Sequence, residues 1–246
     1  MIEARDLKKS FGAQPVLEGV NLSIAEGESV VIIGRSGGGK SILLKLLVGL
    51  IRPDSGEVII DGENIAAMNE RRLLLVRHKF GMLFQSAALF DSMTVAENVG
   101  FALRREKNLT PAELNRRVSE ALEMVDLPGT EAKKPSELSG GMRKRVGLAR
   151  AIVYRPEIVL YDEPTTGLDP VVSDSIDQLI VRVRDRLNVT SVVVTHDMRS
   201  ARRVGQRILM LRQGKIYAEG TPDQIFSSSD PVIHNFVNGI SDKEGD

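Results

Sequence analysis

Residues 29–33, Ser-Val-Val-Ile-Ile, lead directly into Gly34-Arg35-Ser36-Gly37-Gly38-Gly39-Lys40-Ser41, and this stretch decides the fold. The β-branched run predicts a buried strand, and residues 42–50 have the apolar spacing of a helix. Between them lies a phosphate-loop pattern, in which backbone N–H groups surround phosphates and the helix adds its positive end. We expect all eight residues to bind ATP, with Lys40 reaching the β- and γ-phosphates and Ser41 binding Mg²⁺. The alternative is a glycine-rich turn without a ligand.

Length and composition limit the class of protein. The chain has 246 residues, and its 33 basic side chains balance 33 acidic ones, which argues against a nucleic-acid-binding surface. Without cysteine it has neither disulfides nor thiolate metal sites. No apolar stretch approaches the roughly 20 residues of a membrane span, and residues 1–10 do not read as a secretory signal. We therefore predict one domain, residues 1–246, that stays in the cytosol and binds no nucleic acid.

Strand and helix patterns alternate along the rest of the chain. Early strands at 2–8, 20–24 and 58–60, with Asp61-Gly62 as a hairpin turn, indicate an antiparallel β layer. Later patterns indicate a parallel sheet with helices. The later strands are predicted at 80–84, 158–161, 191–195, 208–211 and 215–219, and the helices at 95–105, 111–125, 141–154 and 171–187.

These patterns predict an α/β protein in three parts. Residues 1–87 and 157–225 form a catalytic core, and residues 88–156 form an inserted helical subdomain. Residues 226–246 form a tail, with an amphipathic stretch at 230–238, which is either frayed or a contact for a partner.

Two carboxylates follow the apolar strand at 158–161. Asp162 and Glu163 stand at its carboxyl end, where open α/β sheets place their ligands. Asp162 suits a Mg²⁺ shell, and Glu163 is expected to polarise the attacking water, because phosphoryl transfer depends on positioning and charge. The alternative is that one carboxylate only caps a turn.

Three further side chains are candidates for the same site. Gln85 ends the strand at 80–84, and its amide is expected to bind Mg²⁺ or the water. His196 follows the strand at 191–195 and is expected to contact the γ-phosphate or to organise the water beside Glu163, although a histidine is more often structural. Phe11 is a candidate to stack on adenine, although an aromatic residue at a strand end is as often packing.

Ser139-Gly140-Gly141 precedes a helix-compatible run and predicts an anion site at a helix N-terminus. The alternative without a ligand is a serine N-cap followed by glycines that form a turn. The basic run Arg143-Lys144-Arg145 lies just inside that helix, and we interpret it as a solvated face.

Together these motifs resemble the ATP-binding cassette family, in family order and over residues 2–225. The motifs are the phosphate loop, Gln85, Leu138-Ser139-Gly140-Gly141, Asp162-Glu163, Gly167-Leu168-Asp169-Pro170 and His196. The resemblance implies a RecA-like phosphate-loop core with an antiparallel β layer and an inserted helical subdomain. It also implies that two copies pair head to tail, each presenting its signature, Ser139-Gly140-Gly141, to the ATP of the other, with Asp169 bridging the copies near Glu163.

Two positions depart from the family pattern. Met142 stands where most members have glutamine, and Phe11 stands where tyrosine is commoner. The first change removes a hydrogen-bonding side chain at the end of the signature, and the second keeps an aromatic ring. Neither change predicts an inactive enzyme.

A transport role requires separate membrane subunits, and residues 86–95 are the candidate surface for a permease; the alternative is that they belong to the insertion's own core. Residues 81–91, the methionine-ended signature and the tail are similar to the Mla, or Mce-associated, subgroup. That resemblance implies phospholipid transport between bacterial membranes, at the cytoplasmic face of the inner membrane. The same resemblance implies two further partners, a periplasmic Mce-type lipid-binding protein and a small cytosolic regulator. One alternative is a transporter of amino acids, metal chelates or lipoproteins. Another is a soluble cassette ATPase without a transport role. A phosphate-loop kinase is a third, but it would leave the signature and Asp169 unexplained.

Overall fold

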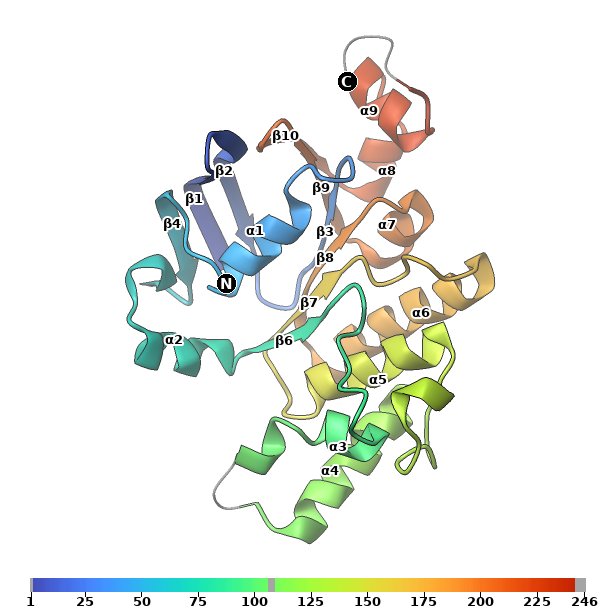
Figure 1. Ribbon diagram of the computed structural model, residues 1–246. Coiled ribbons are helices and arrows are strands. Elements are labelled where there is room, and N and C mark those ends of the chain that lie inside the picture. Colours follow the sequence, from blue (N-terminus) through green and yellow to red (C-terminus); the bar gives the residue numbers. More distant parts are fainter. Residues whose placement is uncertain (1, 106–108, 242–246) are drawn as a thin grey trace. The chain divides into compact units, whose positions relative to one another are not determined.

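The structure is a computed structural model that describes residues 2–105 and 109–241 (Figure 1). Its contacts divide the chain into a first unit, residues 1–76 and 192–246, and a second unit, residues 77–191. This division follows packing, so the predicted functional boundaries near 87 and 156 stay a prediction. No helix in the described part of the chain combines the length and the apolar character needed to cross a bilayer.

The first unit contains the predicted antiparallel layer. Its strand order is β2-β1-β4-β5, and every neighbouring pair is antiparallel. Asp61 and Gly62 both have positive φ, 50° and 84°, and they join β4 to β5 as a tight hairpin turn. The layer's strands are β1 (Ile2–Phe11), β2 (Gln14–Ile24), β4 (Ser55–Ile60) and β5 (Glu63–Asn64).

A second group of strands in this unit carries the phosphate loop. β3 runs parallel to β9, and β9 pairs antiparallel with β10. The group comprises β3 (Ser29–Ile33), β9 (Arg207–Arg212), β10 (Lys215–Gly220) and β8 (Thr190–Thr195), which begins in the second unit. All five residues of β3 are buried, as its unbroken apolar run predicts.

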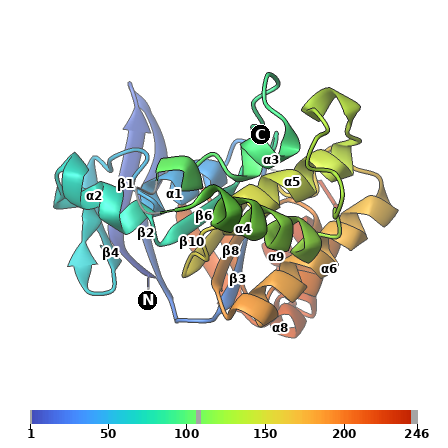
Figure 2. The ribbon, with the colours of Figure 1, turned by 90° about the horizontal axis from the view of Figure 1, so that it is seen from below.

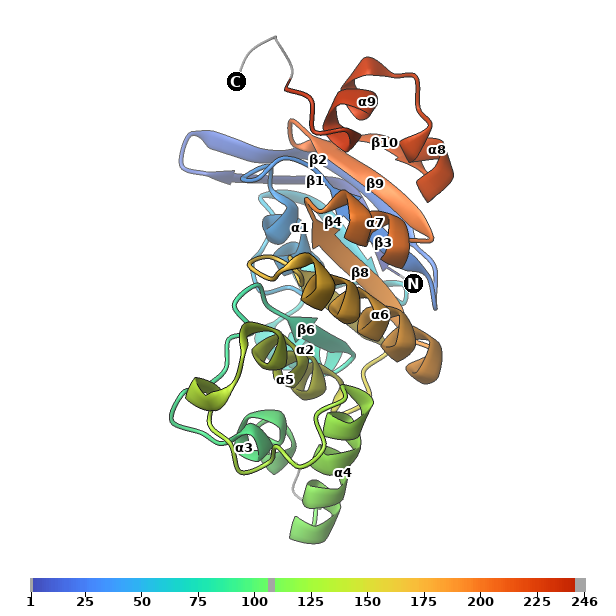
Figure 3. The same ribbon diagram turned by 90° about the vertical axis from the view of Figure 1, so that its right-hand side faces the viewer.

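Helices surround these strands. Helix α1 (Lys40–Leu47) lies between the antiparallel layer and β3 (Figures 1 and 3). Leu43, Leu44, Leu46 and Leu47 of α1 are buried and no residue of α1 is exposed, as a helix between two layers requires. The other helices of the unit are α2 (Glu70–Arg77), which extends one residue into the second unit, α7 (Met198–Val204), α8 (Pro222–Phe226), α9 (Pro231–Val237) and the 3-10 turn Ile65–Ala67.

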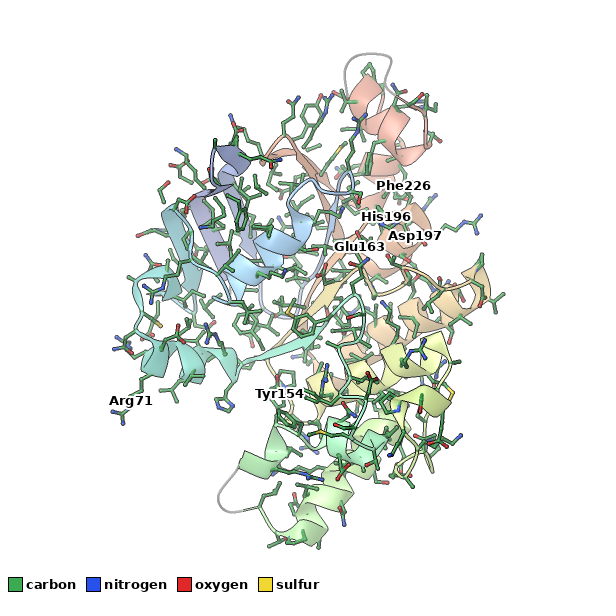
Figure 4. All side chains as sticks on the ribbon, viewed as in Figure 1. Arg71, Tyr154, Glu163, His196, Asp197 and Phe226 are labelled. Atoms are coloured by element: carbon green, nitrogen blue, oxygen red, sulfur yellow. The ribbon has the colours of Figure 1, made fainter. Side chains whose placement is uncertain are left out.

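The second unit combines a parallel strand pair with a helical group. β6 (Phe80–Leu83) pairs with β7 (Ile158–Asp162), and α5 contacts α3, α4 and α6 (Figure 2). The Tyr154 hydroxyl (Figure 4), just beyond α5, donates a hydrogen bond to the Phe80 carbonyl oxygen of β6, and burial raises its pKa to about 12. The helices are α3 (Val95–Val99), α4 (Pro111–Met124), α5 (Gly140–Ile152) and α6 (Pro170–Leu187), with 3-10 turns at Leu103–Arg105 and Pro135–Glu137.

Two predictions of secondary structure were wrong in part, and one helix was not predicted. The helix predicted over 95–105 ends at Val99, because Gly100 forms its C-cap, and a separate 3-10 turn follows. Strand β2 starts six residues before the predicted residue 20, and its pairing with β1 contains register shifts that break the alternation of burial. Helix α2 was not predicted, because it buries only Leu73 and so lacks an amphipathic pattern.

Candidate nucleotide site

The phosphate loop joins β3 to α1 in the first unit. A side chain at Gly34 would overlap the Leu211 carbonyl oxygen of β9, so only glycine fits where the loop leaves the strand. Lys40 begins α1 and is only 5% exposed. Its Nζ donates hydrogen bonds to the carbonyl oxygens of Gly34, at 2.9 Å, and Arg35, at 3.1 Å, which closes the loop around the lysine. These bonds hold the ammonium of Lys40 against the backbone of its own loop.

Two other candidates of the first unit lie on its surface. Phe11 ends β1 with 51% of its surface exposed, and Lys9 Nζ lies 5.5 Å from the ring centroid. This exposure suits stacking on a base better than core packing. His196 is exposed directly after β8, and Asp197 beside it caps α7 by accepting hydrogen bonds from the N–H groups of Arg199 and Ser200 (Figure 4). His196 is therefore not a core histidine.

The two carboxylates stand at the end of β7 in the second unit. Asp162 is 6% exposed and Glu163 is 8% exposed. Glu163 has a left-handed backbone, with φ of 47°, which is uncommon for a residue other than glycine. Its Oε2 accepts a hydrogen bond from Thr166 Oγ1 at 3.1 Å. The backbone therefore leaves the extended conformation at Glu163, directly after β7.

Gln85 follows β6, and its side chain is exposed. The next residues form an irregular segment in which Ala87 and Ala88 have positive φ values of 60° and 47°. Arg150 of α5 donates hydrogen bonds of 2.7 Å to the carbonyl oxygens of both alanines. Such backbone conformations cost free energy, and the guanidinium bonds offset this cost.

The signature begins helix α5. Ser139 is the N-cap, and its Oγ accepts a hydrogen bond of 3.2 Å from the Met142 N–H. Ser139 is also exposed, so the N-cap and the anion-site interpretations both fit the same geometry. Asp169 caps α6 by accepting hydrogen bonds of 3.0 Å from the N–H groups of Val171 and Val172.

The interpretation of Arg143-Lys144-Arg145 as a solvated face holds for the exposed Arg143 but was wrong for Lys144 and for the partly buried Arg145. Lys144 is 5% exposed, and its Nζ donates hydrogen bonds to Gln85 O at 2.5 Å and Glu163 O at 3.1 Å. Arg143 donates to Leu138 O, and Arg145 donates to Val125 O. The contacts of Lys144 and Arg145 are with residues distant in the sequence. The pattern of charges along the sequence therefore does not reveal them.

Each unit brings part of the predicted set together. The first unit carries Phe11, the phosphate loop and His196, whereas the second carries the other predicted groups. Those groups are Gln85, Asp162, Glu163, Ser139-Gly140-Gly141 and Asp169. The sequence analysis missed Thr166 and Arg150 and predicted that Lys144 faces solvent. One signal could have indicated that Lys144 is buried, because it is a single cation within an otherwise apolar stripe of the helix.

A phosphate loop followed by an acidic pair at a strand end is typical of a phosphate-loop nucleoside triphosphatase. The family model described as "ABC transporter" matches residues 17–166, and the chain belongs to this family of ATP-binding cassettes. It is a cassette ATPase of the transporter type, binds ATP and has the cassette fold that the sequence predicted.

Known relatives extend over nearly the whole chain. The chain is 43% identical to the "Probable ribonucleotide transport ATP-binding protein mkl" of Mycobacterium leprae, over 97% of this chain and 69% of that protein. It is 39% identical to the "Intermembrane phospholipid transport system ATP-binding protein MlaF" of Escherichia coli K12, over 98% of this chain and 90% of that protein. A solved dimer of the cassette MJ0796, bound to ADP and Pi, superposes with a TM-score of 0.82 at 35% identity, covering 90% of this chain and 99% of that one.

Proposed function

We propose that two copies of this chain pair head to tail and hydrolyse ATP at two shared sites. The observation that carries this proposal is the signature Ser139, which is exposed and forms the N-cap of helix α5. Exposed N–H groups at such a terminus bind phosphate. The dimeric assembly and the bound ADP and Pi of the MJ0796 structure support the proposal.

Within each site, different residues bind Mg²⁺, bind the phosphates and polarise the attacking water. Ser41, Gln85 and Asp162 offer oxygen atoms, which are the donors that Mg²⁺ prefers, so this donor set fits the ion. Mg²⁺ supplies charge neutralisation for the phosphates when it is bound. Glu163 polarises the attacking water, Lys40 binds the β- and γ-phosphates, and His196 contacts the γ-phosphate. Asp169 bridges the copies close to Glu163.

The ATPase drives a separate integral-membrane permease, and the transported substrate is phospholipid moved between bacterial membranes. The similarity to MlaF supports this substrate, because the alignment spans 90% of a protein named for phospholipid transport. The similarity to mkl, named for probable ribonucleotide transport, favours a competing substrate. Amino-acid, metal-chelate or lipoprotein transport would keep the same cassette chemistry.

The permease contacts residues 86–95. The segment is irregular, and Phe90 in it is 43% exposed. The buried Asn98 anchors it from α3: Oδ1 accepts from Phe90 N at 2.8 Å, and Nδ2 donates to the carbonyl oxygens of Phe90, Met93 and Thr94. An exposed aromatic residue on a firmly anchored loop suits a contact with a partner's helix.

The remaining assignments follow from the same proposal. The ATPase pair lies at the cytoplasmic face of the inner membrane, beneath its permease. A periplasmic Mce-type lipid-binding protein and a small cytosolic regulator complete the complex. The similarity of residues 81–91 and the tail to the Mla subgroup supports these partners.

Affinity purification from detergent-solubilised host membranes, followed by mass spectrometry, tests the proposal. A permease together with an Mce-type protein supports phospholipid transport, and bound phospholipid in the purified complex adds direct support. A permease with a solute receptor overturns the lipid assignment but keeps the transporter. Only soluble partners would contradict the transport role.

A further inference from the structure

We propose that Lys144 is a positioning residue for ATP hydrolysis, because its ammonium ties the main chain at Gln85 to the main chain at Glu163. This inference rests on the proposed role of Glu163 as the group that polarises water. Lys144 acts through that residue, by its hydrogen bonds to main-chain oxygens. Both of its partners and the lysine itself belong to the second unit.

The geometry forms a three-way junction. Lys144 lies in the second turn of α5, the helix that Ser139 begins. Its Nζ donates one hydrogen bond to the carbonyl oxygen after β6, at 2.5 Å, and another to the carbonyl oxygen after β7, at 3.1 Å. One side chain therefore joins the signature helix to the two residues proposed to act on Mg²⁺ and water.

This location is electrostatically costly for a cation. Burial lowers the pKa of Lys144, and the carboxylates of Asp162 and Glu163 oppose that shift. The positive end of the α5 dipole also lies close by, and the first turn of α5 contains no acidic residue to offset it. Fold stability alone does not favour a lysine here over a neutral side chain of similar length.

The contact with Glu163 has a specific consequence. Glu163 has φ of 47°, and its carbonyl oxygen accepts hydrogen bonds from Lys144 Nζ and, at 3.3 Å, from the Thr166 N–H. Because the backbone torsions fix the direction of the Glu163 side chain, loss of the lysine bond allows the peptide to rotate and the carboxylate to move. Displacement of a reacting group by about 1 Å costs about 100-fold in rate.

Arg145 provides a matched control on the same helix. It is the next residue and carries the same charge, but it contacts Val125 O, Asp126 and Ser175 on a different side of α5. Removing its charge changes the helix to a similar degree without touching Gln85 or Glu163. A general effect of losing a cation from α5 would therefore appear in both variants.

The test compares Lys144→Met, Lys144→Arg and Arg145→Met in the full chain, with Glu163→Gln as the reference. For Lys144→Met we expect kcat to fall about 100-fold while KM for MgATP stays within about 3-fold, because an orienting contact is lost and nucleotide binding is kept. Lys144→Arg restores N–H donors and recovers at least about 10-fold of the loss. Arg145→Met keeps kcat within about 3-fold.

Several results would overturn the inference. A folded Lys144→Met with unchanged kcat, an equal loss in Arg145→Met, or no recovery in Lys144→Arg would each do so. If Lys144→Met does not fold, Lys144→Gln decides, because its shorter amide cannot reach both carbonyl oxygens and kcat must fall about 10-fold. If Glu163→Gln itself hydrolyses normally, the proposed role of Glu163 fails; if only Glu163→Gln loses activity, the role of Lys144 fails alone.

Discussion

Thr166 Oγ1 donates a hydrogen bond of 3.1 Å to Glu163 Oε2. This bond holds one carboxylate oxygen of a residue that is only 8% exposed, so the other oxygen has a defined direction. A carboxylate that is fixed in this way is suited to orienting a water molecule, which is the main task in phosphoryl transfer.

The first prediction concerns this carboxylate. Replacing it by an amide in Glu163→Gln keeps the shape and the Thr166 contact but removes the negative charge, so we expect hydrolysis to fall by about 100-fold or more. ATP binding and ATP-dependent pairing should persist, because ground-state contacts survive. Phosphate release and size-exclusion chromatography with ATP measure the two properties. Normal hydrolysis in this variant would remove Glu163 from its role.

The second prediction concerns Mg²⁺. Chelation of the metal should abolish hydrolysis, and Asp162→Asn should raise the Mg²⁺ concentration needed for half-maximal activity by about 10-fold or more, since it removes an anionic oxygen donor. Asp185→Asn, which changes an exposed carboxylate of α6, is the matched control. A Mg²⁺ requirement that is the same in both variants would contradict the assignment of Asp162.

The third prediction concerns packing beneath the signature helix. A methyl group at Gly81 of β6 would overlap the Ala151 carbonyl oxygen of α5. Gly81→Ala should therefore lower the free energy of unfolding by about 2–3 kcal/mol, whereas Met82→Leu on the same strand should cost less than about 1.5 kcal/mol. Urea denaturation followed by circular dichroism measures both changes. Equal stability of the two variants would show that the helix moves away without cost.

The fourth prediction concerns pH. Burial acts to raise the pKa of Glu28, but hydrogen bonds from the Arg207 side chain and the Ala25 N–H outweigh it and hold the pKa below its ordinary value of 4.5. A carboxyl with a lowered folded-state pKa stabilises the fold above its unfolded pKa and loses this contribution as pH falls through the folded pKa.

Wild type should therefore be more stable than Glu28→Gln by about 1 kcal/mol near neutral pH, after allowing for partial solvent screening. The difference should shrink as pH falls below 4.5. Urea midpoints of both proteins across this range provide the measurement. A difference that grows in acid would mean that the Glu28–Arg207 pair, with Oε1 and Nε 2.6 Å apart, is not its source.

Local chemistry explains which parts of the fold were predictable. The phosphate loop, the Asp61-Gly62 turn and the buried strand β3 depend on residues next to each other, so their patterns predicted them correctly. Helix α2 was not predicted because Leu74 and Leu75 are exposed, so its apolar residues do not form one face.

The interactions around the site were less accessible to sequence reasoning. Lys144 is buried by contacts with Gln85 and Glu163, which are far from it in the chain, so the run of charges around it predicted exposure instead. The positive φ of Glu163 likewise arises from the turn that follows β7. Motifs thus provide the candidate residues of the site, whereas the contacts that hold these residues in place are tertiary.

The most direct test of the shared-site account uses the absence of cysteine from the chain. Gly38→Cys places a thiol in the phosphate loop, where a Cβ would lie 3.0 Å from Arg35 O, and Ser139→Cys places one in the signature. Both are made in the Glu163→Gln background, mixed with ATP and oxidised. The account predicts a cross-linked dimer only in the mixture of the two variants and only with ATP. Cross-linking that is absent from the mixture, or equal without ATP, would contradict it.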